Sequence, residues 1–126
     1  MHKQHAVITI VVSRPGVMQQ ALRTSLLICP AITVLDSAGD GLTAVRRIAA
    51  HQPALVVIDA NLLPEEAEAL IAIVKTSHTP ARCLVFVQSQ RHEAMMTAAG
   101  ADAVMLRDSS AGELQAVLAR LIGLGP

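Results

Sequence analysis

The stretch Pro53-Ala54-Leu55-Val56-Val57-Ile58-Asp59 places four consecutive large apolar side chains directly before a carboxylate. A short apolar run that is rich in β-branched residues and follows a proline is typical of a strand buried on both faces. Such strands belong to parallel sheets whose two faces are covered by helices. Residues 55–58 therefore predict a central parallel strand, with Asp59 at its carboxyl end.

Four other apolar runs share this character, at residues 6–12, 32–35, 84–87 and 103–106. Segments with helical spacing alternate with these runs, and the last of them begins with a capping box, Ser110 followed by Glu113. Alternating buried strands and helices require right-handed crossovers. The sequence therefore predicts an α/β, flavodoxin-like domain: a five-stranded parallel sheet in the order 2-1-3-4-5 with helices on both faces.

The length and composition limit the possible functions. The 126 residues suit one domain, with residues 1–5 as an N-terminal tail and 123–126 as a C-terminal tail or linker stub. Phe86 is the single aromatic residue, and ten acidic side chains balance ten basic ones, which argues against direct nucleic-acid binding. The apolar stretches fall short of the roughly 20 residues of a membrane span, so we expect a cytoplasmic protein. Cys29 and Cys83 are expected to be reduced, semi-buried thiols.

A functional crevice is expected at the carboxyl ends of the strands, where the strand order reverses. The position of Asp59 fits a cap of the following loop as well as a functional group, so its position alone leaves both roles open. The residues that follow the predicted strands, and are therefore candidates for this crevice, are Ser13, Arg14, Asp59, Ala60, Asn61, Gln88, Ser89, Arg107 and Asp108.

Several motifs along the chain form one pattern. They are residues 53–59 with Pro64 five positions on, Asp36-Ser37-Ala38-Gly39-Asp40-Gly41, Gly100-Ala101-Asp102-Ala103 and Leu106-Arg107-Asp108-Ser109-Ser110. From about residue 7 to residue 122, this pattern resembles the receiver domain of two-component response regulators, in the subgroup usually followed by a helix-turn-helix output domain. The resemblance implies a role in a phosphorelay. It also implies that Asp59 matches the aspartate phosphorylated by a histidine kinase, and that the Asn61 carbonyl matches a Mg²⁺ ligand.

The sequence departs from this family at the metal site. Family members carry an acidic pair after the first strand, but the chain has Ser13 and Arg14. A hydroxyl and a cation do not replace two carboxylates as ligands of Mg²⁺, which prefers octahedral oxygen donors. We therefore expect no bound metal and no other cofactor, and Asp59 and Asn61 are the only ligands that the resemblance would offer to Mg²⁺.

Three other family positions also differ. Arg107 replaces the lysine that ends the fifth strand, which keeps the positive charge on a planar group. Gln88 stands at the position of the hydroxyl residue that ends the fourth strand, and Ser89 follows one place late. Val104 replaces the aromatic switch residue of the fifth strand. The segment from Ser89 onward to residue 100 is also about one turn shorter than is usual in the family.

These differences predict an altered pocket. We expect Arg14 and Arg107 to face Asp59 together and to hold its carboxylate ionised. The leading hypothesis is a non-enzymatic, degenerate receiver-like signalling domain with weak or absent Mg²⁺-dependent phosphorylation. One alternative is a competent receiver, phosphorylated at Asp59, that controls a fused or separate DNA-binding output domain. A second is an unrelated flavodoxin-like ligand-binding protein or enzyme, although the sequence has no glycine-rich phosphate loop.

The sequence also bears on partners and on the remaining histidine, glutamate and methionine residues. The family resemblance implies a histidine kinase or an output domain as partner, and a homodimer through the fourth helix, fifth strand and fifth helix. Met95 and Met96 are expected to divide between the core and the surface. We expect solvated or capping roles for His51, His78 and His92, and complementation of a helix dipole by Glu65, Glu66 and Glu68.

Overall fold

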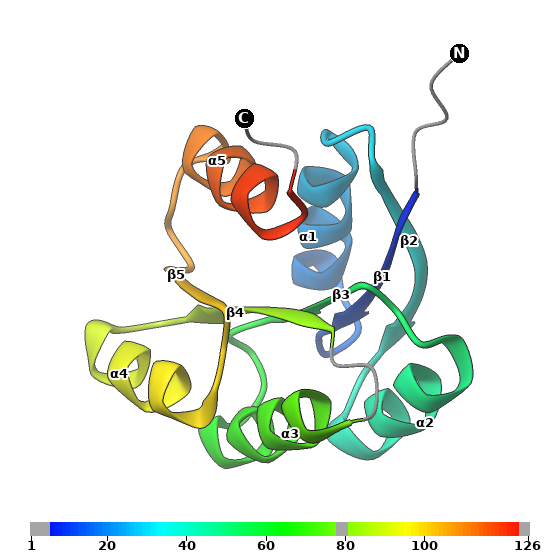
Figure 1. Ribbon diagram of the computed structural model, residues 1–126. Coiled ribbons are helices and arrows are strands. Elements are labelled where there is room, and N and C mark those ends of the chain that lie inside the picture. Colours follow the sequence, from blue (N-terminus) through cyan, green and yellow to red (C-terminus); the bar gives the residue numbers. More distant parts are fainter. Residues whose placement is uncertain (1–5, 78–80, 124–126) are drawn as a thin grey trace.

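The computed structural model describes residues 6–77 and 81–123. His78 and most of the two predicted tails lie outside the described residues. Strands and helices alternate strictly along the chain (Figure 1). In chain order they are β1 (Val7–Val12), α1 (Val17–Leu27), β2 (Ile32–Ala38), α2 (Gly41–His51), β3 (Leu55–Ile58), α3 (Pro64–Thr76), β4 (Arg82–Val87), α4 (Gln90–Ala99), β5 (Ala103–Leu106) and α5 (Ala111–Leu121).

The five described strands form one parallel sheet in the order β2-β1-β3-β4-β5. This confirms the predicted flavodoxin-like topology. From β1 the chain passes to β2 on one side and then returns to β3 on the other side. The order therefore reverses between β1 and β3, and the residues that follow these two strands lie next to each other.

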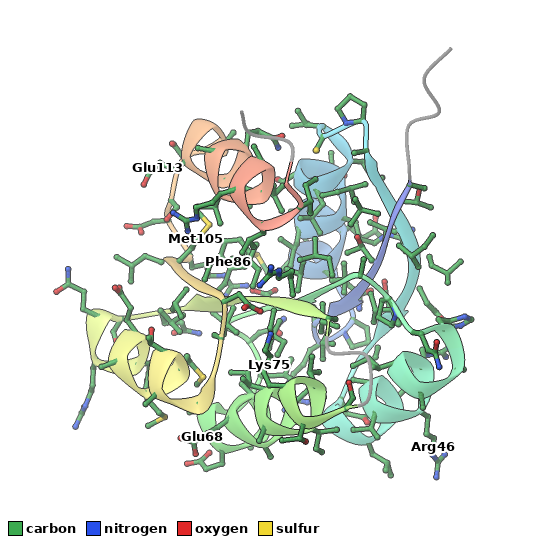
Figure 2. The ribbon with its side chains drawn as sticks, in the orientation of Figure 1. Arg46, Glu68, Lys75, Phe86, Met105 and Glu113 are labelled. Atoms are coloured by element: carbon green, nitrogen blue, oxygen red, sulfur yellow. The ribbon has the colours of Figure 1, made fainter. Side chains whose placement is uncertain are left out.

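Each face of the sheet packs against its own apolar layer. Helices α1 and α5 cover one face, and α2, α3 and α4 cover the other (Figure 1). Alternate residues of a strand point to opposite faces, so Ile10 and Val12 of β1 pack toward α2 and α3, whereas Val11 packs toward α1 and α5. Figure 2 shows Phe86 and Met105 between the sheet and α5, where both side chains are buried. Most of the other buried side chains in the two layers are aliphatic.

Two of the predicted strand boundaries were wrong. Strand β2 continues to Ala38, so Asp36 and Ser37, which we expected in a turn, belong to the strand. The pairing with β1 shifts at a bulge: Thr9 pairs with Val34 and Ile10 with Asp36. Leu35 is skipped by the pairing and is 47% exposed. Strand β4 begins at Arg82, before the predicted run at 84–87.

Helix ends are fixed by the capping residues that the sequence offers. The predicted capping box at the start of α5 is confirmed, since Ser110 Oγ accepts from the Glu113 backbone N–H and the Glu113 carboxylate accepts from the Ser110 N–H. Asp40 caps α2 in a similar way by accepting from the Thr43 N–H at 2.8 Å. Pro64 opens α3 at a position where a missing N–H costs nothing.

The exposure of individual side chains tests several smaller predictions. Met96 lies in the core and Met95 is 38% exposed, as expected. Cys29 and Cys83 are free thiols, and both are buried, with Cys83 fully inaccessible, not semi-buried as predicted. Among the described residues, no helix is both long enough and apolar enough to cross a membrane.

Candidate functional site

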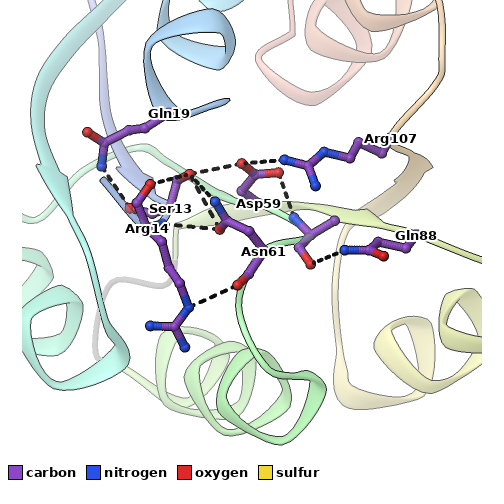
Figure 3. A network of polar contacts seen from close by, with 8 residues as sticks. Ser13, Arg14, Gln19, Asp59, Asn61, Gln88 and Arg107 are labelled. Atoms are coloured by element: carbon purple, nitrogen blue, oxygen red, sulfur yellow. Dashed lines mark hydrogen bonds and ion pairs between the residues drawn. The ribbon is translucent and has the colours of Figure 1, made fainter. Parts of the chain in front are cut away.

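The buried carboxylate of Asp59 stands at the point where the strand order reverses. Its backbone N–H continues the pairing with β1 by donating to the Val12 carbonyl at 2.9 Å. The residue is 5% exposed. The Ala60 N–H donates to Asp59 Oδ1 at 2.6 Å, and Ser13 Oγ donates to Oδ2 at 2.9 Å (Figure 3). The Asp59 carboxylate is therefore held by neutral donors from the loop after β1 and from its own loop.

Ser13 links Asp59 to the loop that follows β3. Its side chain is fully buried, and its Oγ accepts from Asn61 Nδ2 at 3.1 Å while donating to Asp59. Asn61 Oδ1 in turn accepts from the Arg14 backbone N–H at 3.1 Å. Gln19 of α1 donates to the Ser13 carbonyl at 2.7 Å. These bonds fix the β1–α1 loop against the β3–α3 loop.

The prediction that Arg14 faces Asp59 was wrong. Successive side chains of an extended segment point in opposite directions, so when Ser13 turns toward Asp59, Arg14 turns away from it. The Arg14 guanidinium instead donates from Nε to the Asn61 carbonyl at 3.1 Å (Figure 3). Its Nη2 lies 3.4 Å from Glu66 Oε1, and the Arg14 side chain is 48% exposed.

Glu66 belongs to this network, although sequence reasoning gave it only a helix-dipole role. Its Oε2 accepts from the Gly41 N–H at 2.8 Å, so one carboxylate joins the start of α2, the first turn of α3 and Arg14. Gly41 has no room for a side chain without movement of Glu66, because a Cβ there would lie 3.2 Å from Glu66 Cγ. The only signal in the sequence is the placement of Glu66 after Pro64, which does not reveal its partners.

Arg107 reaches Asp59 as predicted. It follows β5, and its Nη2 lies 3.6 Å from Asp59 Oδ2 on the side of the carboxylate opposite to Asn61 (Figure 3). The Arg107 side chain is 28% exposed. Its Nε and Nη2 atoms are buried, and neither has a hydrogen-bond partner among the described residues. Among residues 6–77 and 81–123, Arg107 is the only cation that lies within 4 Å of Asp59.

The other candidate residues contribute less. Gln88 Nε2 donates to the Ala60 carbonyl at 3.3 Å, which places this side chain at the edge of the site. Ser89 Oγ lies 3.5 Å from His92 Nδ1 in the first turn of α4 and does not contact Asp59. Asp108 is exposed and takes no part in the hydrogen bonds around Asp59. Val104 is partly buried against the core.

Two cavities open on Asp59, and Phe86 lines both. The first, of about 290 Å³, lies between the β3–α3 loop and α4 and includes Leu62, Gln88 and His92. The second, of about 180 Å³, lies between α1 and the start of α5 and includes Arg107. Asp59 is thus reached from two separate cavities.

The residues around Asp59 do not fit the metal ion that the fold family implies. Mg²⁺ takes several oxygen ligands in octahedral geometry. Here Ser13 offers one neutral hydroxyl, and the Asn61 carbonyl already accepts from Arg14. The one carboxylate at the site, that of Asp59, already faces the cation of Arg107. Within residues 6–77 and 81–123, no three acidic, histidine or cysteine side chains converge as ligands.

Comparisons with known proteins identify the fold. No protein-family model matches the sequence, and no curated protein sequence matches it. The signal receiver domain of the response regulator NarL from Mycobacterium tuberculosis superimposes with a TM-score of 0.81 at 23% identity, over 94% of this chain and 98% of that chain. The chain has the receiver fold.

Two further structures with the receiver fold are similar over most of the chain. A LuxR-family two-component response regulator from Aurantimonas has a TM-score of 0.82 at 24% identity, over 94% of this chain and 86% of that one. The receiver domain of a sensor histidine kinase from Pseudomonas aeruginosa has a TM-score of 0.81 at 17% identity, over 94% and 98%, and holds a magnesium ion in its active-site cleft. At these identities the likeness establishes the fold, and the role of Asp59 stays a prediction.

Proposed function

We propose that this chain is a receiver-like signalling domain in which Mg²⁺-dependent phosphorylation of Asp59 is weak or absent. The observation that carries the proposal is the contact of Arg14 with the Asn61 carbonyl and Glu66. A cation fixed to the protein takes up the carbonyl oxygen that the family resemblance assigns to the metal. This contact holds the β1–α1 loop and the β3–α3 loop together without a metal ion.

The chemistry of phosphoryl transfer supports this proposal. The transition state spreads negative charge over the phosphoryl oxygens, and positioned cations, usually including Mg²⁺, stabilise that charge. Around Asp59, the described residues supply only the monovalent Arg107, at 3.6 Å. Ser13 also donates to Oδ2 of the carboxylate that would attack. The reaction at Asp59 is therefore expected to be slow.

A receiver-like domain that does not depend on a metal needs another input. We infer that its conformation responds to protein contacts, with a histidine kinase or an output domain as the partner class. The surface formed by α4, β5 and α5 is the expected homodimer interface, and the exposed Met95 of α4 adds a polarisable apolar side chain to this region.

A phosphodonor experiment tests the proposal. The purified protein is incubated with Mg²⁺ and acetyl phosphate, and its intact mass is followed over time. We expect the wild type to stay unmodified, and we expect the double variant Ser13→Asp/Arg14→Asp, which restores the acidic pair, to gain a phosphoryl group. Asp59→Ala in that double variant is the control for the site of modification.

The second candidate function is a competent receiver that controls a DNA-binding output domain. It is favoured by the placement of Arg107 beside Asp59, because the same geometry would stabilise a phosphoryl group on Asp59. Ready phosphorylation of the wild type, lost in Asp59→Ala, would establish this candidate and overturn the first.

A further inference from the structure

A groove between α1 and the start of α5 leads from the surface to Arg107 and Asp59. Its walls are apolar, with Met18 and Leu22 from α1 and Leu114 from α5. Arg107 and Asp59 at the inner end add opposite charges, and three serine residues add further polar groups: Ser25, Ser109 and Ser110. Apolar walls with a few convergent polar groups are the usual composition of a small-molecule site.

Arg107 has unused hydrogen-bonding capacity at the inner end of this groove. A guanidinium carries five N–H donors, and burying a donor without a partner costs free energy. Nε and Nη2 of Arg107 are buried without hydrogen-bond partners in the described chain, and Asp59 lies at the long distance of 3.6 Å. Because 28% of the side chain is exposed, a rotation of its last torsions would turn the Nε–Nη2 edge into the groove.

We propose that this groove binds a small organic anion, an apolar ring or short chain that carries one carboxylate. The carboxylate pairs with the Nε–Nη2 edge of Arg107 in the bidentate geometry that suits the two planar groups. The apolar body lies against Leu22 and Leu114. This inference goes beyond the proposed function, because it holds whether or not Asp59 accepts a phosphoryl group.

The groove is large enough for such a ligand, and its charge favours it over the other cavity. A cavity of about 150 Å³ accepts benzene, and the groove offers about 180 Å³. Both cavities contain the Asp59 carboxylate, but the cavity between the β3–α3 loop and α4 has no lysine or arginine to offset this charge, so it does not attract an anion. The α1–α5 groove is the one of the two that contains a guanidinium.

Binding in the groove changes the surroundings of Asp59. The ligand carboxylate competes with Asp59 for the same guanidinium, because Nη2 of Arg107 is the atom nearest to Asp59. Occupancy of the groove therefore loosens the Asp59–Arg107 ion pair. The signal passes to the strand-end network without a metal ion.

The test uses benzoate as the probe, and NMR spectra of protein with labelled methionine and leucine methyl groups. The methyls of Met18, Leu22 and Leu114 line the groove, whereas Leu70 and Met96 lie in the opposite layer and serve as internal controls. We expect saturable shifts at the groove methyls with a Kd of about 1 mM, as suits a ligand of this size. Benzamide, which lacks the charge, and inorganic phosphate, which lacks the apolar body, are each expected to bind at least about tenfold more weakly.

Variants test separately whether binding needs the charge of Arg107 and the open volume of the groove. Arg107→Gln is expected to weaken benzoate binding about tenfold or more, whereas Arg91→Gln, which removes an exposed charge from α4, is expected to leave it unchanged. Ala21→Leu fills the groove while Arg107 stays in place, and it is expected to abolish the shifts. The proposal is overturned if benzoate moves no groove methyl, if it binds Arg107→Gln as tightly as the wild type, or if benzamide or phosphate binds equally well.

Discussion

Replacement of Asp102 is expected to lower the free energy of unfolding, because this residue links three elements of the fold. This residue stands just before β5 and makes two hydrogen bonds to the backbone of Cys83 in β4. Its N–H donates to the Cys83 carbonyl at 2.9 Å, and its Oδ2 accepts from the Cys83 N–H at 2.7 Å. Lys75 Nζ of α3 lies 2.8 Å from the same oxygen. One carboxylate thus ties α3 and β4 to the start of β5.

The expected magnitude follows from these contacts. Asp102→Ala leaves the Cys83 N–H without its acceptor, at a cost of about 1–2 kcal/mol, and removes a mostly buried charge-assisted bond to Lys75 worth about 1–2 kcal/mol. We expect a loss of about 2–4 kcal/mol in the free energy of unfolding. Asp102→Asn keeps an acceptor for the Cys83 N–H, so we expect it to lose only about 1–2 kcal/mol.

The pH dependence separates the charge from the hydrogen bond. Burial raises the pKa of Asp102, but the bonds from Lys75 and the Cys83 N–H, together with the charges of Lys75 and Arg82, outweigh burial and hold the pKa below its ordinary value. A lowered pKa in the folded protein means that the stabilisation is complete above the unfolded pKa of about 4 and disappears as the pH falls through the folded pKa. The difference between wild type and Asp102→Asn should therefore be constant near neutral pH and shrink in acid.

Urea denaturation followed by circular dichroism at neutral and acidic pH measures both effects. The reasoning is refuted if Asp102→Ala changes the free energy of unfolding by less than about 0.5 kcal/mol, the range of neutral surface substitutions. It is also refuted if the deficit of Asp102→Asn is as large in acid as at neutral pH.

Three further predictions concern a helix end, a cap and a thiol. Gln52 adopts a left-handed conformation with φ 46° after α2, so Gln52→Gly should raise the free energy of unfolding by about 0.5–1 kcal/mol, and a lowered Tm would contradict this. Ser110→Ala removes the capping box of α5 and should cost about 1 kcal/mol in urea denaturation, whereas an unchanged midpoint would argue against the cap. Burial raises the pKa of the Cys83 thiol to about 12, so iodoacetamide at pH 8 should label Cys83 only after unfolding, and mass spectrometry of the native protein would reveal any exception.

Most of the fold could be predicted from the sequence because each buried strand is a short run of apolar residues. Residues 55–58 and 103–106 were placed correctly as strands for this reason. The end of β2 could not be predicted, because Asp36 and Ser37 are polar and resemble a turn. They form a strand because β2 lies at the edge of the sheet, where polar side chains remain partly solvated.

The candidate site was predicted in part. Asp59 follows β3 and Arg107 follows β5, two parallel strands whose carboxyl ends lie at the same edge of the sheet with only β4 between them, so a long side chain such as Arg107 can be expected to reach Asp59. The direction of Arg14 does not follow from the topology, because either Ser13 or Arg14 could have faced Asp59, and the partner of the outward Arg14, Glu66, is 52 positions away in the sequence and meets it only after folding. The groove between α1 and α5 was also missed, since its lining residues come from segments far apart in the sequence, from Met18 to Leu114.

Magnesium titration tests the proposed loss of the metal site most directly. The backbone amide signals of Asp59 and Asn61 are followed by NMR as Mg²⁺ is added to the wild type and to Ser13→Asp/Arg14→Asp. The contacts of Arg14 and Ser13 predict no saturable change in the wild type and a saturable change in the double variant. A saturable response of these two amides in the wild type would contradict the account.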